Sequence, residues 1–209
     1  RDKCVVVPSS IRIEEYIDDA QRFDLSISNK EKIVLFVGRL TYYKGVEYLI
    51  EAMQFVDAKL LIAGDGELRE RLEEMTASLK LEKKVKFLGR VSNEQLKYCY
   101  QICDVFILPS VEPTEAFGLV QLEAMAYGKP VINTQLPTGV PFVSIHGKTG
   151  LTVEPRNSKA LAEAINKLLS DEELRKEYGV QARKRVEENF TVDKMNEKIL
   201  KVYQELMHN

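Results

Sequence analysis

Short apolar runs alternate with longer amphipathic segments along most of this sequence, and the alternation restricts the folds open to it. Most runs are apolar at every position, as is typical of parallel strands that helices cover on both faces. Strands joined by helices in this way form a doubly wound sheet with right-handed crossovers. The sequence therefore predicts an α/β fold with about six parallel strands, at Ile33–Val37, Lys59–Ala63, Val85–Leu88, Val105–Leu108, Val131–Thr134 and Leu151–Val153.

Helical periodicity fills the segments between these strands and continues beyond the last one. Four helices are expected between strands and three more in a helical C-terminal tail at 158–209. In the last helix apolar residues recur at spacings of three and four, so it must pack on the sheet or on another part of a larger protein. The expected ranges are Val46–Phe55, Glu67–Leu79, Asn93–Ile102, about 117–127, Ser158–Leu169, Asp171–Asn189 and Thr191–Leu206.

Three helix starts carry capping signals. Ser92 with Gln95, and Ser170 with Glu173, have the spacing of a capping box, in which each side chain accepts a hydrogen bond from the other residue's backbone. Thr191 precedes the last helix and can cap it through its hydroxyl. These signals predict where three of the helices begin.

Composition places the chain among soluble globular proteins. Of its 209 residues 44% are hydrophobic and 30% charged, and a formal net charge of -2 favours neither nucleic acid nor an acidic membrane as a partner. Without an internal repeat or a linker, residues 1–209 are expected to form a single domain, with 13–31 as a connecting segment. The opening run 4–8 reads as a strand, which indicates a piece of a longer protein.

Three cysteines, Cys4, Cys99 and Cys103, are too few and too odd in number for a disulfide framework, which favours a reducing, cytoplasmic setting. Cys99 and Cys103 lie one helical turn apart, a spacing that a metal pair can use. Since no His or Cys lies near them in the sequence, ordinary buried thiols are the preferred interpretation. The isolated His146 lies in a polar loop and is expected at the surface.

Loops at the carboxyl ends of the expected strands carry the residues of functional interest, because open parallel sheets bind ligands at that edge. After the first strand, Gly38 permits close backbone approach, and Arg39 and Lys44 bring two cations suited to phosphate. Taken alone, such a loop is more often a solvated turn with two surface charges. After the third strand, Gly89 and Arg90 form either a plain turn or a backbone edge for a flat base.

The loop after the second strand contains Gly64 and Gly66 and suggests a dinucleotide fingerprint. That interpretation fails because the third glycine would fall at Arg69, and because the loop does not follow the first strand of the unit. A tight turn with an acidic helix start is the better explanation. The sequence predicts no NAD site.

The loop after the fourth strand is the most informative, because a polar stretch leads into a helix near Phe117, Gly118 and Leu119. Free backbone N–H groups at a helix start suit a phosphate or a sugar oxygen, and Gly118 leaves room for one. Glu123 lies in the largely apolar helix that follows. A carboxylate there is costly to bury unless it has partners such as ribose hydroxyls, although it can instead reach water or a nearby lysine.

Taken together, these loops resemble the group 1 (family 4) retaining glycosyltransferases of the GT-B fold. Glu115 and Glu123 match the family's pair of glutamates separated by seven residues, within the run Glu-Ala-Phe-Gly-Leu-Val-Gln-Leu-Glu-Ala-Met-Ala-Tyr-Gly-Lys-Pro-Val. Gly38-Arg39-Leu40 with Lys44-Gly45 resembles its phosphate-binding loop. The resemblance covers essentially the whole chain and implies the C-terminal, donor-binding domain of such an enzyme, with a Rossmann-like fold.

The resemblance implies a role for each matched residue. Arg39 and Lys44 would bind the donor pyrophosphate and stabilise the charge that develops on it as the sugar leaves. Glu115 would hold hydroxyls of the donor sugar, and these three are the implied catalytic residues. Glu123 would bind the ribose. The implied donor-binding set is completed by Gly38, Gly89, Arg90 and the backbone of Phe117, Gly118 and Leu119.

The implied activity is transfer of a hexose-type sugar from a nucleoside-diphosphate sugar to an acceptor, with retention of configuration. Many glycosyltransferases hold a metal with an Asp-x-Asp pair, and this chain contains no such pair. Two cations and a helix N-terminus can stabilise a diphosphate leaving group instead. A reaction without metal or other cofactor is therefore expected.

Two departures from the family pattern matter. Where many members carry Gly-Gly-Val-Pro-Glu, this chain has Thr138-Gly139-Val140-Pro141-Phe142, which leaves the sugar recognised there open. The family's N-terminal acceptor domain, with its histidine, is absent, and neither His146 nor His208 matches that histidine. This piece alone is expected to bind the donor without turnover, and any membrane association would come through the missing half.

Two other functions stay open at this point. One is a nucleotide-sugar epimerase, which shares the two-domain fold, although the spacing of Glu115 and Glu123 favours a transferase. The other is a non-catalytic nucleotide-sugar-binding module. The presence of Arg39, Lys44 and both glutamates argues against it.

Overall fold

The computed structural model describes residues 4–16, 22–25, 27–28 and 31–207. Six strands form one sheet in the order β3-β2-β1-β4-β5-β6, and every pairing in it is parallel. The predicted doubly wound α/β fold is confirmed. The strands are β1 (Ile33–Val37), β2 (Lys59–Ala63), β3 (Val85–Gly89), β4 (Val105–Leu108), β5 (Val131–Thr134) and β6 (Gly150–Val153).

Helices follow the strands much as the periodicity predicts. The short helix α5 was not expected from the sequence, and the helix expected near 117 begins at Leu119. The helices are α1 (Val46–Ala52), α2 (Arg69–Ser78), α3 (Asn93–Ile102), α4 (Leu119–Ala126), α5 (Val140–Val143), α6 (Ser158–Ser170), α7 (Glu172–Asn189) and α8 (Val192–Met207), with 3-10 turns η1 (Ile13–Tyr16), η2 (Tyr42–Lys44) and η3 (Met53–Phe55).

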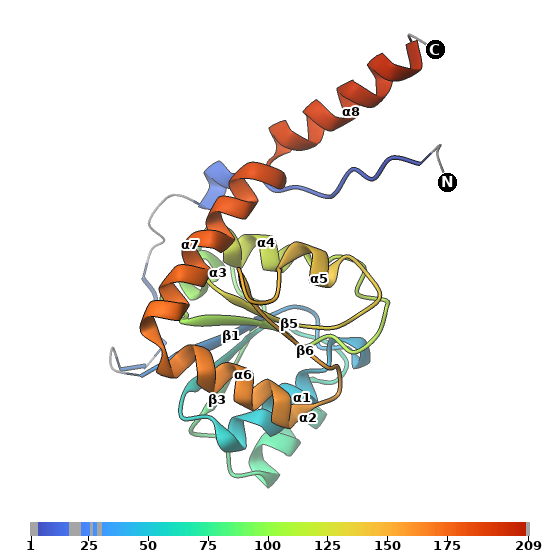
Figure 1. Cartoon of the computed structure of the whole chain (residues 1–209). Helices are drawn as coiled ribbons and strands as arrows, with labels where there is room; N and C mark the ends of the chain where they lie inside the picture. The colour runs from blue at the N-terminus through green and yellow to red at the C-terminus, as the bar shows by residue number, and fades with distance from the viewer. Residues whose placement is uncertain (1–3, 17–21, 26, 29–30, 208–209) are drawn as a thin grey trace.

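Alternate residues of the strands build two hydrophobic cores, one on each face of the sheet. Val34 and Phe36 of β1 point into a core shared with α1, α2 and α6. Leu35 and Val37 point into the other, which contains residues of α3, α4 and the C-terminal half of α7. Figure 1 shows these two helical layers below and above the sheet. The layers leave the loops at the strand ends free to form a site.

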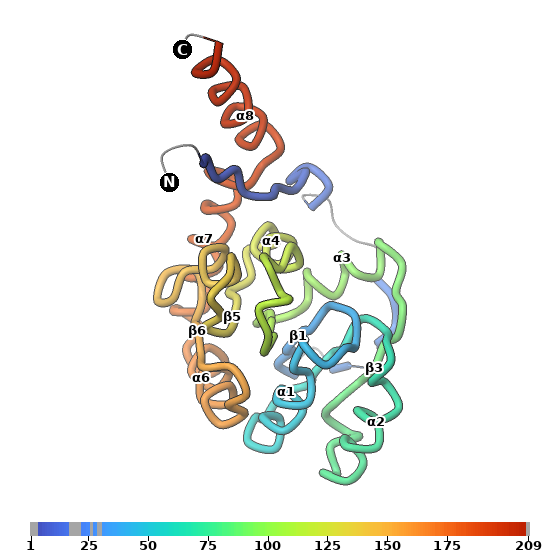
Figure 2. The backbone as a smooth tube through the Cα atoms, turned by 90° about the vertical axis from the view of Figure 1, so that its right-hand side faces the viewer, coloured from blue at the N-terminus to red at the C-terminus, as the bar shows by residue number. Residues whose placement is uncertain are grey.

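The strand order reverses direction between β1 and β4, since the chain runs β1, β2, β3 to one edge and β4, β5, β6 to the other. In open parallel sheets, the loops that leave the carboxyl ends of two such strands turn to opposite faces, and ligands bind between them. Both views show β1 near the middle of the molecule (Figures 1 and 2). The fold therefore predicts the ligand site at the β1 and β4 loops.

The prediction of an opening strand is wrong. Residues 4–10 pair with no strand among the described residues, and Val5 and Val6 are 62% and 83% exposed. The first backbone pairing is at Ile11, whose N–H donates to the carbonyl of Phe190 at 2.9 Å. An apolar run becomes a strand only where it meets a free backbone edge, and this segment meets the end of α7 rather than the edge strands β3 or β6. Parts of the expected connecting segment 13–31, at 17–21, 26 and 29–30, lie outside the described residues.

Helix α8 does not fold back on the sheet. None of its described residues is buried, and Leu206 and Met207 at its end are 69% and 75% exposed. In Figures 1 and 2 it projects from the end of α7, on the same side as the N-terminal segment. The predicted apolar stripe is partly covered, because Val192, Met195, Ile199 and Val202 are half-buried and Leu206 is exposed.

Cys99 in α3 and Cys103 directly after it are buried free thiols, as the sequence predicts. Burial raises the pKa of each to about 12. The described residues contain no group of three His, Cys, Asp or Glu side chains placed to hold a metal ion. No helix in the described part of the chain is both long and apolar enough to span a membrane.

Candidate functional site

Lys44 of the β1 loop and Glu115 of the β4 loop contact each other. Lys44 Nζ donates to Glu115 Oε2 at 2.5 Å, and each side chain is only 10% exposed. Ser110 Oγ donates to the same oxygen at 2.9 Å. The structure thus brings together two residues that lie 71 positions apart and that sequence reasoning assigned to one site.

Close backbone packing holds the two loops together. Gly45 has φ 64°, and a Cβ added to it would lie 2.3 Å from the carbonyl oxygen of Pro109. Val111 N–H donates to the carbonyl of Tyr43 at 2.8 Å. Only glycine fits at position 45, because any side chain would push the β4 loop away. This contact sets the position of the adjacent Lys44.

The phosphate-binding loop of the resemblance lies beside this pair. A Cβ on Gly38 would be 3.7 Å from Lys44 Nζ, so the amine lies over the glycine backbone. Arg39 is exposed, and no described residue accepts a hydrogen bond from its side chain or pairs with it. One cation of the loop is therefore paired and buried, and the other faces solvent.

The β4 loop leads from Glu115 into the start of α4. Gly118 has φ 72°, and a Cβ there would be 2.5 Å from Leu108 Cδ2. Phe117 is half-buried and meets Phe190 edge-on at 6.1 Å, while Leu119 is 45% exposed. Within the described residues the N–H groups of these three residues donate no backbone hydrogen bond. They are available to an anion or a hydroxyl.

Glu123 lies one turn further along α4 and has a partner of its own. Tyr100 Oη donates to Glu123 Oε2 at 2.8 Å. Burial raises the pKa of Glu123, and the Tyr100 hydrogen bond opposes that shift. Burial also raises the pKa of Tyr100, which keeps its hydroxyl protonated as a donor. Both side chains line a pocket of about 130 Å³, with Glu15, Tyr16, Asn93, Leu96 and Lys97 around them. None of the residues of the β1 loop lines this pocket.

The ends of β1, β2 and β3 are tied by backbone hydrogen bonds. Gly38 N–H donates to the carbonyl of Ala63 at 3.0 Å, and Gly64 N–H donates to that of Gly89 at 2.8 Å. Gly89 is buried with φ 66°, whereas Arg90 is exposed. The loop after β2 packs on the β1 loop, where Leu40 N–H donates to the carbonyl of Asp65 at 3.0 Å.

Two contact residues were missed by sequence reasoning. Ser110, which bonds Glu115, lies in the informative loop but carries no distinguishing signal of its own. Tyr100, which bonds Glu123, lies 23 positions away on α3, and no local pattern links the two. Both are found only through the tertiary structure.

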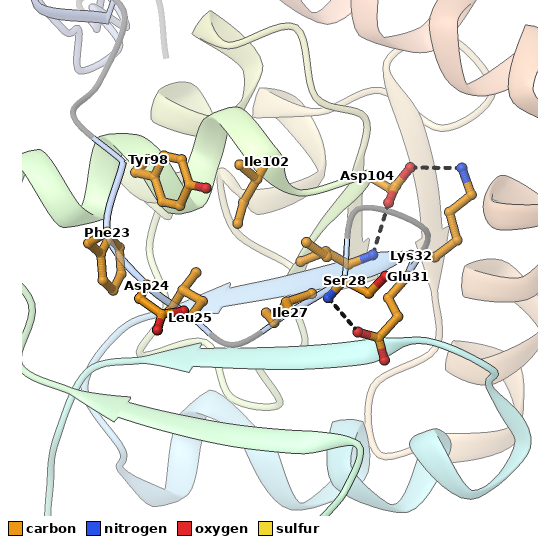
Figure 3. A pocket seen from close by; sticks show the side chains of 11 residues that line it. Phe23, Asp24, Leu25, Ile27, Ser28, Glu31, Lys32, Tyr98, Ile102 and Asp104 are labelled. Atoms are coloured by element: carbon orange, nitrogen blue, oxygen red, sulfur yellow. Dashed lines mark hydrogen bonds and ion pairs between the residues drawn. The ribbon is translucent and has the colours of Figure 1, made fainter.

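A larger groove of about 400 Å³ lies at the opposite edge of the sheet (Figure 3). It is lined by residues just before β1 and β4, among them Lys32 and Asp104. Asp104 already accepts hydrogen bonds from Ile33 N–H at 2.9 Å and from Lys32 Nζ at 3.2 Å. Since parallel sheets place ligands at the carboxyl ends of strands, this groove is not the candidate site.

Comparison with known proteins identifies the family of the chain. The family model described as glycosyl transferases group 1 matches residues 17–185. An uncharacterised glycosyltransferase of Methanocaldococcus jannaschii, MJ1607, is 40% identical over 87% of this chain and 47% of its own length. O-antigen chain mannosyltransferase C of Escherichia coli is 31% identical over 100% of this chain and 56% of its own.

Solved structures show the same fold. Anabaena Alr3699/HepE, solved in complex with UDP, has a TM-score of 0.80 at 26% identity, over 94% of this chain and 56% of that one. The chain spans about half the length of the proteins it matches. By its sequence, its six-stranded sheet and the residues gathered at the β1 and β4 loops, the chain belongs to the group 1 glycosyl transferases.

Proposed function

We propose that this chain is the donor-binding half of a glycosyltransferase that takes a hexose-type sugar from a nucleoside-diphosphate sugar. The observation that carries the proposal is the buried pair of Lys44 and Glu115 at the point where the strand order reverses. A buried cation beside free backbone N–H groups suits a diphosphate, and the adjacent carboxylate suits sugar hydroxyls. HepE, which has the same fold, has been solved with UDP-glucose.

The geometry suggests how the residues divide the work. Lys44 and the exposed Arg39 neutralise the diphosphate, and their charge stabilises it as the bond to the sugar breaks. Both hydrogen bonds to Glu115 use Oε2, so its Oε1 is directed to a hydroxyl of the sugar. Glu123, with its own recess beside α3, holds the ribose.

We assign the remaining donor-binding residues from their places at the carboxyl ends of the strands. Gly89 and Arg90 end β3 on the same edge of the sheet and border the base, while the start of α4 faces the sugar and phosphate. Cations and backbone N–H groups take the place that a metal has in other transferases, and the reaction proceeds with retention of configuration. The cytoplasmic setting expected from the cysteines stays a prediction.

The acceptor is bound by a second half of the protein. The matched relatives are about twice as long as this chain, and α8 exposes large apolar side chains in its second half, at Leu200, Tyr203, Leu206 and Met207. We infer that α8 and the exposed N-terminal segment contact the acceptor-binding half. The catalytic cleft is then completed between the two.

Calorimetry tests the proposal directly. The chain is titrated with UDP, GDP and ADP and with their sugar conjugates, in the presence of EDTA. Binding of one nucleoside diphosphate, lost in Arg39→Ala and Lys44→Ala, is the expected result. Binding that needs added magnesium would contradict the metal-independent mechanism, and the absence of any binding would contradict donor recognition.

An epimerase of the same fold is the alternative. The seven-residue spacing of Glu115 and Glu123 favours the transferase. Incubating the full-length protein with a nucleotide sugar and no acceptor separates the two, because only an epimerase then changes the configuration of the sugar.

A further inference from the structure

A pair of fully buried amide side chains lies behind the start of α4. Gln121 and Asn133 are both 0% exposed, and Asn133 Nδ2 donates to Gln121 Oε1 at 2.9 Å. Gln121 Nε2 donates to the backbone carbonyl of Phe117 at 3.0 Å. The hydroxyl of Thr152 on β6 donates to Asn133 Oδ1 at 2.8 Å. Each amide oxygen accepts and each amide nitrogen donates, so the orientation of both side chains is fixed by their partners.

The same pair also holds the start of α5. Asn133 Nδ2 donates to the carbonyl of Val140 at 3.0 Å, and Gln121 Nε2 approaches the same oxygen at 3.4 Å. Next to Val140, Gly139 N–H donates to the carbonyl of Ala116 at 2.8 Å. A Cβ on Gly139 would lie 2.9 Å from that carbonyl oxygen, so the two backbones are in close contact. The loops after β4 and β5 are thus held against each other by these hydrogen bonds.

These bonds orient two consecutive peptide groups. The carbonyl of the Ala116–Phe117 peptide is held by Gly139, and that of the Phe117–Gly118 peptide by Gln121. In a trans peptide the N–H points opposite to the C=O. The N–H groups of Phe117 and Gly118 are therefore turned away from the protein partners that hold their carbonyls. A pair of donors fixed in advance binds an anion without a reorganisation cost.

We propose that Gln121, held by Asn133, is a positioning residue that aims the backbone N–H groups of Phe117 and Gly118 at the donor diphosphate. This inference rests on the proposed function for the identity of the ligand. The orientation itself rests on the hydrogen bonds of the free chain. The two parts can therefore be tested separately.

The first experiment needs no ligand. Gln121→Met keeps the side-chain volume and removes the amide that bonds Phe117 and Asn133. If this variant fails to fold, Thr152→Val removes only the hydroxyl that bonds Asn133 and weakens the network less. Exchange of the Gly139 and Val143 amides, which donate to the carbonyls of Ala116 and Gly139, is expected to accelerate about tenfold in Gln121→Met, while exchange in α6 stays unchanged. Unchanged exchange of these two amides would overturn the positioning role.

The second experiment measures the preference for the diphosphate, as the ratio of the dissociation constants of UMP to UDP and of GMP to GDP. Gln121→Met is expected to reduce this ratio about tenfold. Thr76→Val is the matched control, because Thr76 makes a buried side-chain hydrogen bond to the Leu72 carbonyl on α2, away from the site. A ratio that stays constant while thermal stability falls would show that Gln121 is only structural. If exchange is accelerated but the chain binds none of UDP, GDP and ADP, the proposed function is refuted and only the orienting role of Gln121 stands.

Discussion

The buried ion pair between Lys44 and Glu115 is better explained by the proposed donor binding than by a contribution to stability. Burying two charges costs desolvation energy, which their attraction and the Ser110 hydrogen bond only offset. A diphosphate that enters beside Lys44 meets a cation that is already desolvated and held. The exposed Arg39, by contrast, is free to move toward the ligand.

Substitutions at these two cations are expected to differ in their effect on stability. Lys44→Met leaves Glu115 buried without its charge partner, and should lower the free energy of unfolding by about 3–5 kcal/mol. Arg39→Ala removes an exposed side chain and should change it by less than about 0.5 kcal/mol. Both variants should lose diphosphate binding. Urea denaturation with calorimetry checks this, and equal destabilisation by the two would contradict the buried-pair description.

The raised pKa of Glu123 predicts a pH-dependent effect on stability. A carboxyl group whose pKa is higher in the folded chain than in the unfolded one destabilises the fold when it is ionised. This penalty is absent below the unfolded pKa and is complete above the folded pKa. Glu123→Gln should therefore stabilise the chain at pH 7 and not at pH 3, and should weaken nucleotide binding. Denaturation curves at the two pH values test this, and a destabilising effect at pH 7 would be the contrary result.

The family resemblance was enough to predict that Lys44 and Glu115 lie together, and the structure shows their contact. The resemblance could not show that Tyr100 orients Glu123 or that Gln121 contacts Asn133, because those contacts join segments 23 and 12 positions apart through the packing of α3, α4 and β5. Side-chain partners across a fold carry no local sequence signal.

Among the secondary-structure elements, the strands were predicted more accurately than the starts of the helices. Ser92 and Gln95 form the predicted capping box. Ser170 and Glu173 do not, because α6 runs through Ser170 and the neighbouring Asp171 caps α7 by accepting from Leu174 N–H at 2.9 Å. Two capping residues in succession compete, and the sequence alone does not decide between them.

The N-terminus of α4 depends on the left-handed backbone of Gly118. Gly118→Ala should destabilise the chain by about 3 kcal/mol, because strain at positive φ adds to a clash with Leu108. Gly147 is the matched control: it has the same φ of 72°, and a Cβ there would meet nothing within 4 Å. Gly147→Ala should cost only about 1 kcal/mol. Thermal denaturation of both variants measures the difference, and equal costs would refute the close contact at Gly118.

On the scale of the whole molecule, alternation of strands and helices was sufficient to predict the sheet, because each crossover is a local unit. The fate of the two ends was not predictable. The opening apolar run has no strand partner, and the apolar stripe of α8 finds no surface on the sheet. Both features are explained if the ends of this chain contact the other half of a longer protein.

That explanation predicts different effects in the short and full-length chains. Leu206→Asp should leave the stability of this chain unchanged within about 0.5 kcal/mol, because Leu206 is already 69% exposed. In the full-length protein it should cost about 2 kcal/mol, since a buried leucine is lost from a contact between halves. Lys201→Asp, outside the stripe, is the control. A similar small effect of Leu206→Asp in both proteins would contradict the contact.

The central claim is that the donor diphosphate binds between the β1 and β4 loops. A crystal structure of the chain with its preferred nucleoside diphosphate tests it most directly. The predicted result is a diphosphate within hydrogen-bond distance of Lys44 Nζ and of the N–H groups of Phe117 and Gly118, with the ribose at Glu123. A nucleotide bound in the groove at the amino ends of the strands (Figure 3), or one that leaves the Lys44 and Glu115 pair untouched, would contradict it.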